Sequence, residues 1–124
     1  MLTLDKFEEA AEVVKKVTQE TKLVYSDYFS SQTGNKVYLK PENMQVTGAY
    51  KIRGAYYKIS TLSQEEREKG LITASAGNHA QGVAYAAKAF GVKANYIKFR
   101  LEPEKSDLAY EKNYEQQEME DLPF

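Results

Sequence analysis

A lysine between small residues and a polar loop before a helix are the features of this sequence best suited to chemistry. Lys51 lies in residues 47–55, which read TGAYKIRGA, with Gly48 and Gly54 close on either side. The positive end of a helix dipole disfavours the charged form of a lysine amine, and a neutral amine is what reacts with a carbonyl compound. Considered alone, however, Lys51 is more readily interpreted as a solvated helix residue, because exposed lysines are the norm.

The second stretch, residues 75–82, reads SAGNHAQG. Backbone N–H groups at the start of a helix can bind an anion such as a carboxylate, and the Asn78 amide can donate to a cofactor oxygen. The alternative is ordinary capping by Ser75 or Asn78, with a tight turn at Gly77. His79 is a candidate base. With no acidic neighbour in sequence, it is more readily interpreted as a structural histidine.

Apolar patterns predict the elements that would position these two stretches. Helical spacing or a capping signature predicts helices at 4–17, 26–32, 51–62, 63–69 and 77–90. Ser26 could cap the second of these, and the third has one apolar face, made by Ile52, Ala55, Tyr56 and Ile59. Alternating or short apolar runs predict strands or extended pieces at 21–25, 36–40, 71–74 and 92–99, and the short run at 71–74 is expected to be buried.

From Val37 onward the predicted order is β-α-β-α-β, which indicates an α/β fold with an open parallel sheet and helices outside it. Ligands of such sheets bind beyond the carboxyl ends of the strands. Lys51 follows the predicted strand at 36–40, and Asn78 follows the one at 71–74. We therefore expect the two residues to share one crevice.

Composition excludes several classes of function. The 124 residues include no cysteine and one histidine, which excludes disulfides and makes a metal site unexpected. No apolar run approaches the length of a membrane span, and the N-terminus lacks the pattern of a signal peptide. We therefore expect a cytoplasmic protein with no membrane partner.

Charge divides the chain in two. Residues 102–124 hold eight acidic and two basic residues, whereas 1–101 hold 15 basic and 10 acidic. We expect 1–101 to be the folded portion and 102–124 to be an acidic tail, helical or disordered. The basic residues are spread along 1–101 rather than clustered, so a nucleic-acid partner is not indicated.

The run KVYLKPENMQVTGAYKIRGA, at 36–55, and the run LITASAGNHAQGVA, at 71–84, together resemble the threonine dehydratases, also called threonine ammonia-lyases. These are fold-type-II, tryptophan-synthase-β-like enzymes that use pyridoxal 5'-phosphate. The resemblance runs from about Leu2 to Ala94. It implies a partial three-layer α/β domain with an open parallel sheet.

The resemblance also implies a role for each site residue. Lys51 matches the lysine that holds pyridoxal phosphate, and Tyr50 stands where the family usually has a phenylalanine beside the ring. Asn78 matches the residue that donates to the cofactor's phenolic oxygen. The loop that binds the substrate carboxylate is matched by Ser75, Ala76, Gly77 and His79.

The implied reaction is α,β-elimination of L-threonine to 2-oxobutanoate and ammonia, with Lys51 removing the α-proton. Serine use is left open. The related serine racemases carry a second serine at the position of Ala76, where it acts as the base on the other ring face. Alanine cannot take that part, so the resemblance favours elimination over racemisation.

Two departures from the family shape our expectations. The family pattern is lost after Ala94, and no glycine-rich run that would bind the cofactor phosphate occurs in the 124 residues. We expect an N-terminal portion of such an enzyme, marginally stable and with little or no activity alone. The alternative is a non-catalytic interaction module, with the acidic tail at 102–124 as its contact segment. It would pair with a fuller relative, a complementing C-terminal half, or another copy in a homo-oligomer.

Overall fold

The structure is a computed structural model that describes residues 2–75, 77–99 and 114–118 of the chain. Its elements in order are α1 (Leu4–Val14), β1 (Val24–Tyr25), α2 (Asp27–Thr33), β2 (Tyr38–Leu39), the 3₁₀ helix η1 (Glu42–Met44), α3 (Lys51–Ser60), α4 (Gln64–Glu68), β3 (Leu71–Thr73), α5 (Asn78–Phe90), β4 (Ala94–Phe99) and β5 (Tyr114–Glu118).

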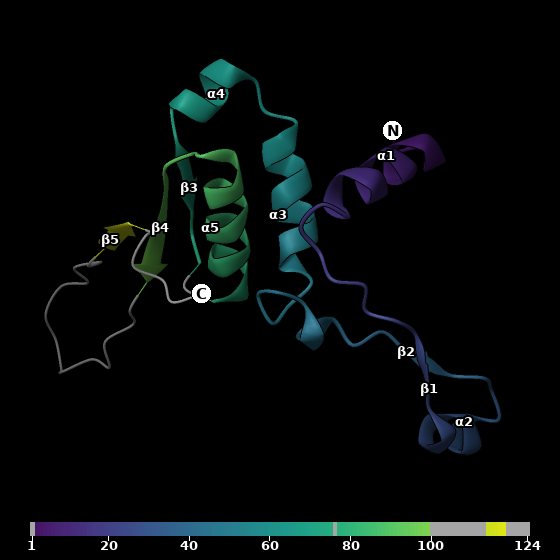
Figure 1. Ribbon diagram of the computed structural model, residues 1–124. Coiled ribbons are helices and arrows are strands. Elements are labelled where there is room, and N and C mark those ends of the chain that lie inside the picture. The colour runs from purple at the N-terminus through teal and green to yellow at the C-terminus, as the bar shows by residue number, and fades with distance from the viewer. Residues whose placement is uncertain (1, 76, 100–113, 119–124) are drawn as a thin grey trace, which may run out of the picture.

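The core lies where α5 packs between the sheet and α3, while α1 packs on α3 (Figure 1). The predicted apolar face of α3 is confirmed, since its four members are all buried: Ile52, Ala55, Tyr56 and Ile59. The matching face of α5 is built mainly from alanine, which lets the helices approach closely: Ala80, Val83, Ala84, Ala86 and Ala87. Tyr56 closes one end of this core by packing its ring against Phe90, with 4.7 Å between ring centroids.

The main sheet has the order β3-β4-β5. Strands β3 and β4 are parallel, with Leu71 opposite Ala94, and α5 is the crossover between them. Strand β5 is antiparallel to β4, with Phe99 opposite Tyr114. The predicted strand at 71–74 is confirmed, but its burial is not, because the Ile72 side chain is 64% exposed.

The predicted strand at 36–40 does not join this sheet. It is present as β2 but pairs antiparallel with β1 in a separate two-stranded sheet, with Tyr25 opposite Tyr38. The physical reason is local: α2 folds the chain back, and the Tyr25 and Tyr38 rings meet edge to face at 5.3 Å. Alternation identifies a strand but not its partner, so the sequence pattern placed this strand in the wrong sheet.

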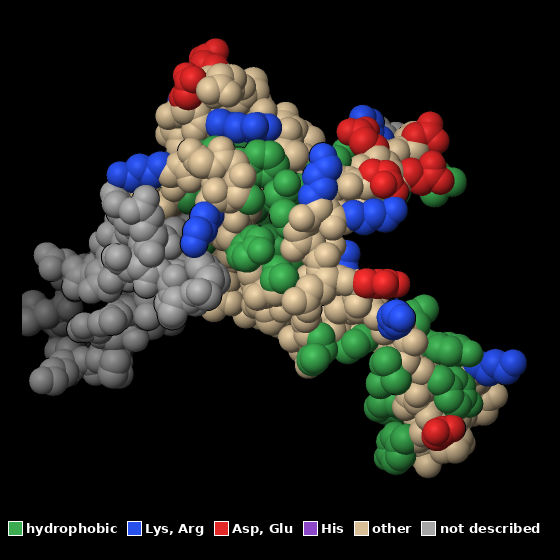
Figure 2. Space-filling view, in the orientation of Figure 1, with side chains coloured by type: hydrophobic (Ala, Val, Ile, Leu, Met, Phe, Trp, Pro, Cys, Tyr) green, Lys and Arg blue, Asp and Glu red, His purple; other side chains and the backbone are tan. Residues whose placement is uncertain are grey.

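Segment β1-α2-β2, residues 24–39, stands apart from the helices and sheet of the core (Figure 1). The Ser26 hydroxyl accepts from the Phe29 N–H, which confirms the predicted cap of α2. The segment and its flank expose large apolar side chains, which gather in the lower-right projection of Figure 2: Leu23, Val24, Tyr25, Tyr28, Phe29, Tyr38 and Leu39. We call this set the aromatic patch.

Of residues 102–124, the structure describes 114–118. These form strand β5, whereas a helix or disorder was expected there. The remainder of that segment lies outside the described residues. Within residues 2–75, 77–99 and 114–118, no helix has the length and apolarity needed to cross a membrane.

Two helix backbones approach closely at Gly82, in the second turn of α5. A Cβ atom built at Gly82 would lie 3.1 Å from the Ile52 nitrogen and from the Lys51 carbonyl carbon, and 3.2 Å from the Lys51 oxygen. Any side chain at position 82 would therefore push α3 away from α5. The absence of a side chain at Gly82 sets how closely the first turn of α3 approaches α5.

Gly82→Ala should therefore destabilise the chain. Overpacking against α3 costs about 1–3 kcal/mol, and the better helix propensity of alanine offsets up to about 1 kcal/mol of that. Urea unfolding should show a net loss of about 1 kcal/mol. Gly54→Ala is the matched control, because nothing lies within 4 Å of its added Cβ. A Gly82→Ala protein as stable as the Gly54→Ala protein would contradict the close packing.

Candidate active site

Lys51 is the first residue of α3, and its side chain is half-buried. Its Nζ lies 5.0 Å from the centroid of the Tyr50 ring, which is itself 58% exposed. Among the described residues, Lys51 makes no hydrogen bond or ion pair through its side chain. The amine is therefore next to an exposed aromatic face and is not held by a carboxylate.

The predicted loop leads into α5, which begins at Asn78 after the N-cap Gly77. The Ser75 hydroxyl accepts from the Gly77 N–H at 3.3 Å, but no side chain caps the helix within the described residues. Ordinary capping by Ser75 or Asn78 is therefore not what this loop does. The first N–H groups of α5 have no partner within the helix, which is the condition for anion binding.

The remaining loop residues divide into those that the structure describes and one that it does not. Gly77, Asn78 and His79 are exposed, and Ser75 is half-buried. His79 makes no hydrogen bond among the described residues, so the interpretation as a packed structural histidine was wrong. Ala76 lies outside the described residues.

The two stretches lie together because α3 and α5 begin at the same end of the core (Figure 1). Gly82 contacts the backbone of Lys51 and Ile52, and Asn78 precedes Gly82 by four residues, which is about one helical turn. The expectation of a shared crevice rested on neighbouring parallel strands. The juxtaposition is instead made by direct packing of one helix start on the next helix.

Glu42 and Arg53 connect the loop before Lys51 to the first turn of α3. The Arg53 Nε donates to Glu42 Oε2 and its Nη2 to Glu42 Oε1, both at 2.8 Å. The Thr21 hydroxyl also donates to Glu42, and the Lys40 Nζ lies 3.9 Å from Oε1. The Arg53 guanidinium, helped by the Thr21 hydroxyl, lowers the pKa of Glu42 to about 2. Arg53 is thus paired with Glu42.

The loop is fixed a second time in its middle by Gln45, which is buried. Its amide accepts from the Gln19 N–H at 2.7 Å and donates to the Gln19 oxygen at 3.0 Å. The Gly48 N–H then donates to the Gln45 carbonyl at 2.7 Å, in a turn where Gly48 adopts φ +68°. Glycine suits this turn because other residues are strained in that conformation.

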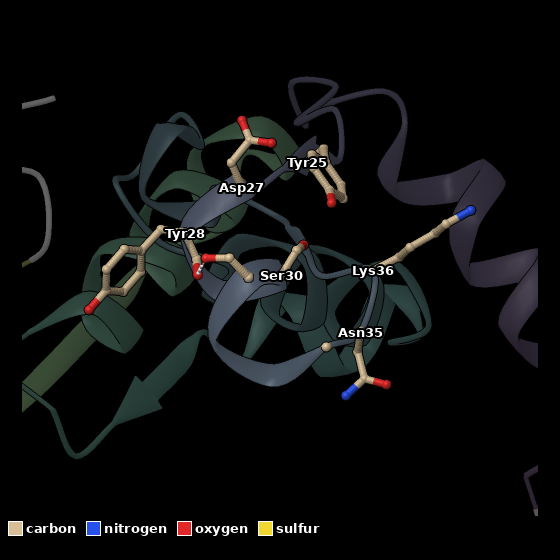
Figure 3. A pocket seen from close by; sticks show the side chains of 8 residues that line it. Tyr25, Asp27, Tyr28, Ser30, Asn35 and Lys36 are labelled. Carbon is tan, nitrogen blue, oxygen red and sulfur yellow. Dashed lines mark hydrogen bonds between the residues drawn. The ribbon is translucent and has the colours of Figure 1, made fainter.

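A hollow of about 640 Å³ lies at α2, well away from Lys51 in the sequence and lined by Tyr25, Asp27, Tyr28, Ser30, Ser31, Gly34, Asn35 and Lys36. Figure 3 shows that the side chains of Asp27, Asn35 and Lys36 point in different directions rather than toward one point. Binding sites for small molecules need a few convergent polar groups. The hollow therefore does not compete with Lys51 as a candidate active site.

Comparison with known proteins identifies the family. The sequence profile of the family described as pyridoxal-phosphate dependent enzyme matches residues 14–104. The chain belongs to this family. The match continues past Ala94, so the expectation that the family pattern is lost there was wrong.

Among curated proteins, the chain is 52% identical over 103 residues to the L-threonine ammonia-lyase of Thermotoga maritima. The match covers 83% of this chain and 26% of that protein. Among solved structures, the chain is similar to a serine racemase from Dictyostelium discoideum, with 38% identity and a TM-score of 0.70 over 75% of this chain and 30% of that one. The processed form of threonine deaminase isoform 2 from Solanum lycopersicum is similar at 37% identity and a TM-score of 0.68, over 82% and 30%.

These shares mean that the chain spans about a quarter to a third of the length of the relatives it matches. The resemblance to threonine dehydratases is confirmed, and so is the α/β fold class. Lys51 and the loop at 75–79 are recognisable in the sequence, but the residues that position them are not: Gly82, Gln45, and Glu42 with its contact to Thr21.

The hydrogen-bonded ion pair between Glu42 and Arg53 should make the folding stability of the chain depend on pH. The pKa of Glu42 is about 2 in the folded chain against an ordinary 4.5, so its contribution is fully present above about pH 4.5. It should be lost as the pH falls from about 4.5 to about 2, a change of about 3 kcal/mol. Glu42→Gln should flatten this part of the profile measured by urea unfolding. Identical profiles for both proteins would contradict the assignment.

Proposed function

We propose that this chain carries the reactive lysine and the anion-binding helix start of a pyridoxal-phosphate-dependent threonine ammonia-lyase. The observation that supports it most is the packing at Gly82, which sets the lysine at the start of α3 against the second turn of α5. Among the residues that the structure describes, an amine without a carboxylate partner and a helix start without a side-chain cap then lie side by side. The identity to the Thermotoga maritima protein supports the choice of reaction.

The side chains at this site are of the chemical types that could hold pyridoxal phosphate. Lys51 offers a half-buried amine without an ion-pair partner among the described residues, and Tyr50 offers an exposed ring within 5.0 Å of that amine. Asn78 offers an exposed amide at the start of α5. We propose that these three residues hold pyridoxal phosphate, with Lys51 joined to it covalently.

We propose that the substrate carboxylate binds at the loop formed by Ser75, Ala76, Gly77 and His79. Backbone N–H groups at the start of α5 would donate to it, and the helix dipole favours a negative charge there. The Ser75 hydroxyl already orders this loop by accepting from Gly77. A carboxylate held at this helix start would place an amino acid beside the first turn of α3.

When bound, pyridoxal phosphate supplies an electron sink for the bonds at the α-carbon of an amino acid. Lys51 would act as the general base that takes the α-proton, which needs a positioned amine within reach of that carbon. Ala76 offers no side chain able to transfer a proton on the other face. We therefore propose elimination from L-threonine rather than the racemisation named for the similar Dictyostelium discoideum protein.

The chain contains no two adjacent glycines, and so no glycine-rich run of the kind that cradles a phosphate. We propose that the chain by itself has little or no lyase activity. The proposal is therefore best tested through cofactor binding at Lys51, which does not depend on turnover.

Incubation with pyridoxal phosphate followed by borohydride should attach a pyridoxyl group to Lys51 in preference to other lysines. The reason is that Lys51 is positioned beside Tyr50 and α5, whereas Lys58 on the same helix is exposed to solvent. Peptide mass spectrometry measures the label at each position. Lys51→Arg should remove the preferred label without changing the circular dichroism spectrum, and Lys58→Arg is the matched control. Equal labelling of all lysines would contradict the proposal.

A second candidate function is supported by the aromatic patch. Its members are 45–69% exposed, which is unusual for seven large apolar side chains at 23–39. We propose that this patch packs against further protein, supplied by a fuller relative or by another copy of this chain. This is the interaction-module alternative, but we propose that the contact lies on β1-α2-β2 rather than on the acidic tail expected from the sequence.

Association through the aromatic patch should be lost on placing charges in it. Tyr28→Lys with Leu39→Lys should shift sedimentation equilibrium toward the monomer, or abolish co-purification with the Thermotoga maritima relative, because a buried charge opposes packing. Glu65→Lys, on the exposed helix α4, is the control and should change neither result. A wild-type chain that is a monodisperse monomer and binds no relative would contradict this second function.

A further inference from the structure

The carboxylate of Glu42 is the point at which three segments of the chain meet. It belongs to η1, it accepts two hydrogen bonds from Arg53 in the first turn of α3, and it accepts one from Thr21 in the segment after α1. Lys40 completes the cluster, because its Nζ donates to the Thr21 oxygen at 2.7 Å. Only 18% of the Glu42 side chain is exposed, so the carboxylate is largely shielded from solvent.

The contact between Glu42 and Arg53 closes a ring of chain that contains Lys51. The ring runs from Glu42 through the turn at Gly48 to Arg53, and Lys51 lies two residues before the point of closure. Side chains two residues apart on a helix point in different directions. Arg53 can therefore fix the helix turn that carries Lys51 without occupying the space around the lysine amine.

Without this closure, the first turn of α3 is held mainly by packing. The backbone of Lys51 and Ile52 rests against Gly82, and Ile52 is fully buried. That packing sets the distance between the helices, but a non-directional contact does not fix rotation of the turn. Two charge-assisted hydrogen bonds in a forked arrangement are directional and do fix it.

We propose that Glu42 is a positioning residue for Lys51, acting through Arg53 to set the orientation in which the lysine meets its carbonyl ligand. The inference rests on the proposed function, in which that ligand is pyridoxal phosphate. Glu42 is not itself a proton acceptor in the reaction, because within the described part of the chain its carboxylate contacts Arg53, Thr21 and Lys40. Its lowered pKa agrees, since a carboxylate held so firmly in its charged form is a weak base.

The test compares labelling by pyridoxal phosphate and borohydride in the full chain and in Glu42→Gln. The ratio of label at Lys51 to label at Lys58 should fall by about tenfold in the variant, the factor expected for one lost charge-assisted hydrogen bond. Arg53→Lys keeps the charge but loses the forked contact, so it should give an intermediate ratio. It also serves as the second variant where Glu42→Gln does not fold.

The control for a general loss of stability is Arg67→Gln, far from Lys51 in the sequence. Arg67 donates to the Ser60 oxygen at 2.8 Å and stacks on Phe90, so its loss weakens the attachment of α4 without touching the ring. At matched unfolding free energy, this variant should retain the wild-type ratio. A Glu42→Gln ratio equal to wild type, or an equal fall in Arg67→Gln, would overturn the inference. An unlabelled wild-type Lys51 would overturn the proposed function as well.

Discussion

The position of the candidate site in this chain depends on one close contact between two helix backbones. Gly82 has no side chain, and so the first turn of α3 rests directly on the second turn of α5. The alanines around it, Ala80, Ala84 and Ala87, are small enough for the same approach to continue along the helices. A lysine that opens one helix is thereby brought beside the start of the other.

A second constraint operates on the loop that enters α3. Gln45 binds the backbone of Gln19, and Glu42 binds Arg53 and Thr21, so residues 42–50 are held from both sides of the chain. Packing at Gly82 sets the distance between α3 and α5, and these polar contacts set the orientation of the first turn of α3. The site therefore combines a non-directional apolar contact with a small number of directional hydrogen bonds, which is how rigid binding sites are generally built.

The parts of the fold that could be predicted are those governed by local rules. The capping box at Ser63 and Glu66, the cap of α2 by Ser26 and the buried face of α3 all follow from neighbours in sequence, and all are present. The partner of β2 could not be predicted, because two residues of strand carry no signal for the distant pair they join. The contact at Gly82 was also missed, since a glycine inside a helix does not name the surface against which it packs.

The candidate site shows the same division. Lys51 and the loop at 75–79 were predictable because their residue types suit carbonyl and anion chemistry, and because the family motifs are specific. Glu42, Gln45 and Thr21 were not predicted to belong to the site. Their role depends on hydrogen bonds between residues that lie 11 to 26 positions apart in the sequence. Such contacts are decided by how the chain folds back on itself, and residue spacing along the sequence does not report them.

The most direct test of the central claim is an NMR titration of the isotope-labelled chain with pyridoxal phosphate. The contact at Gly82 predicts nuclear Overhauser effects between the Gly82 α-protons and the Ile52 amide proton. The cofactor should then shift the amide signals of Lys51, Asn78 and His79 together. Absence of the Overhauser effects, or shifts confined to residues far from both helix starts, would contradict the account.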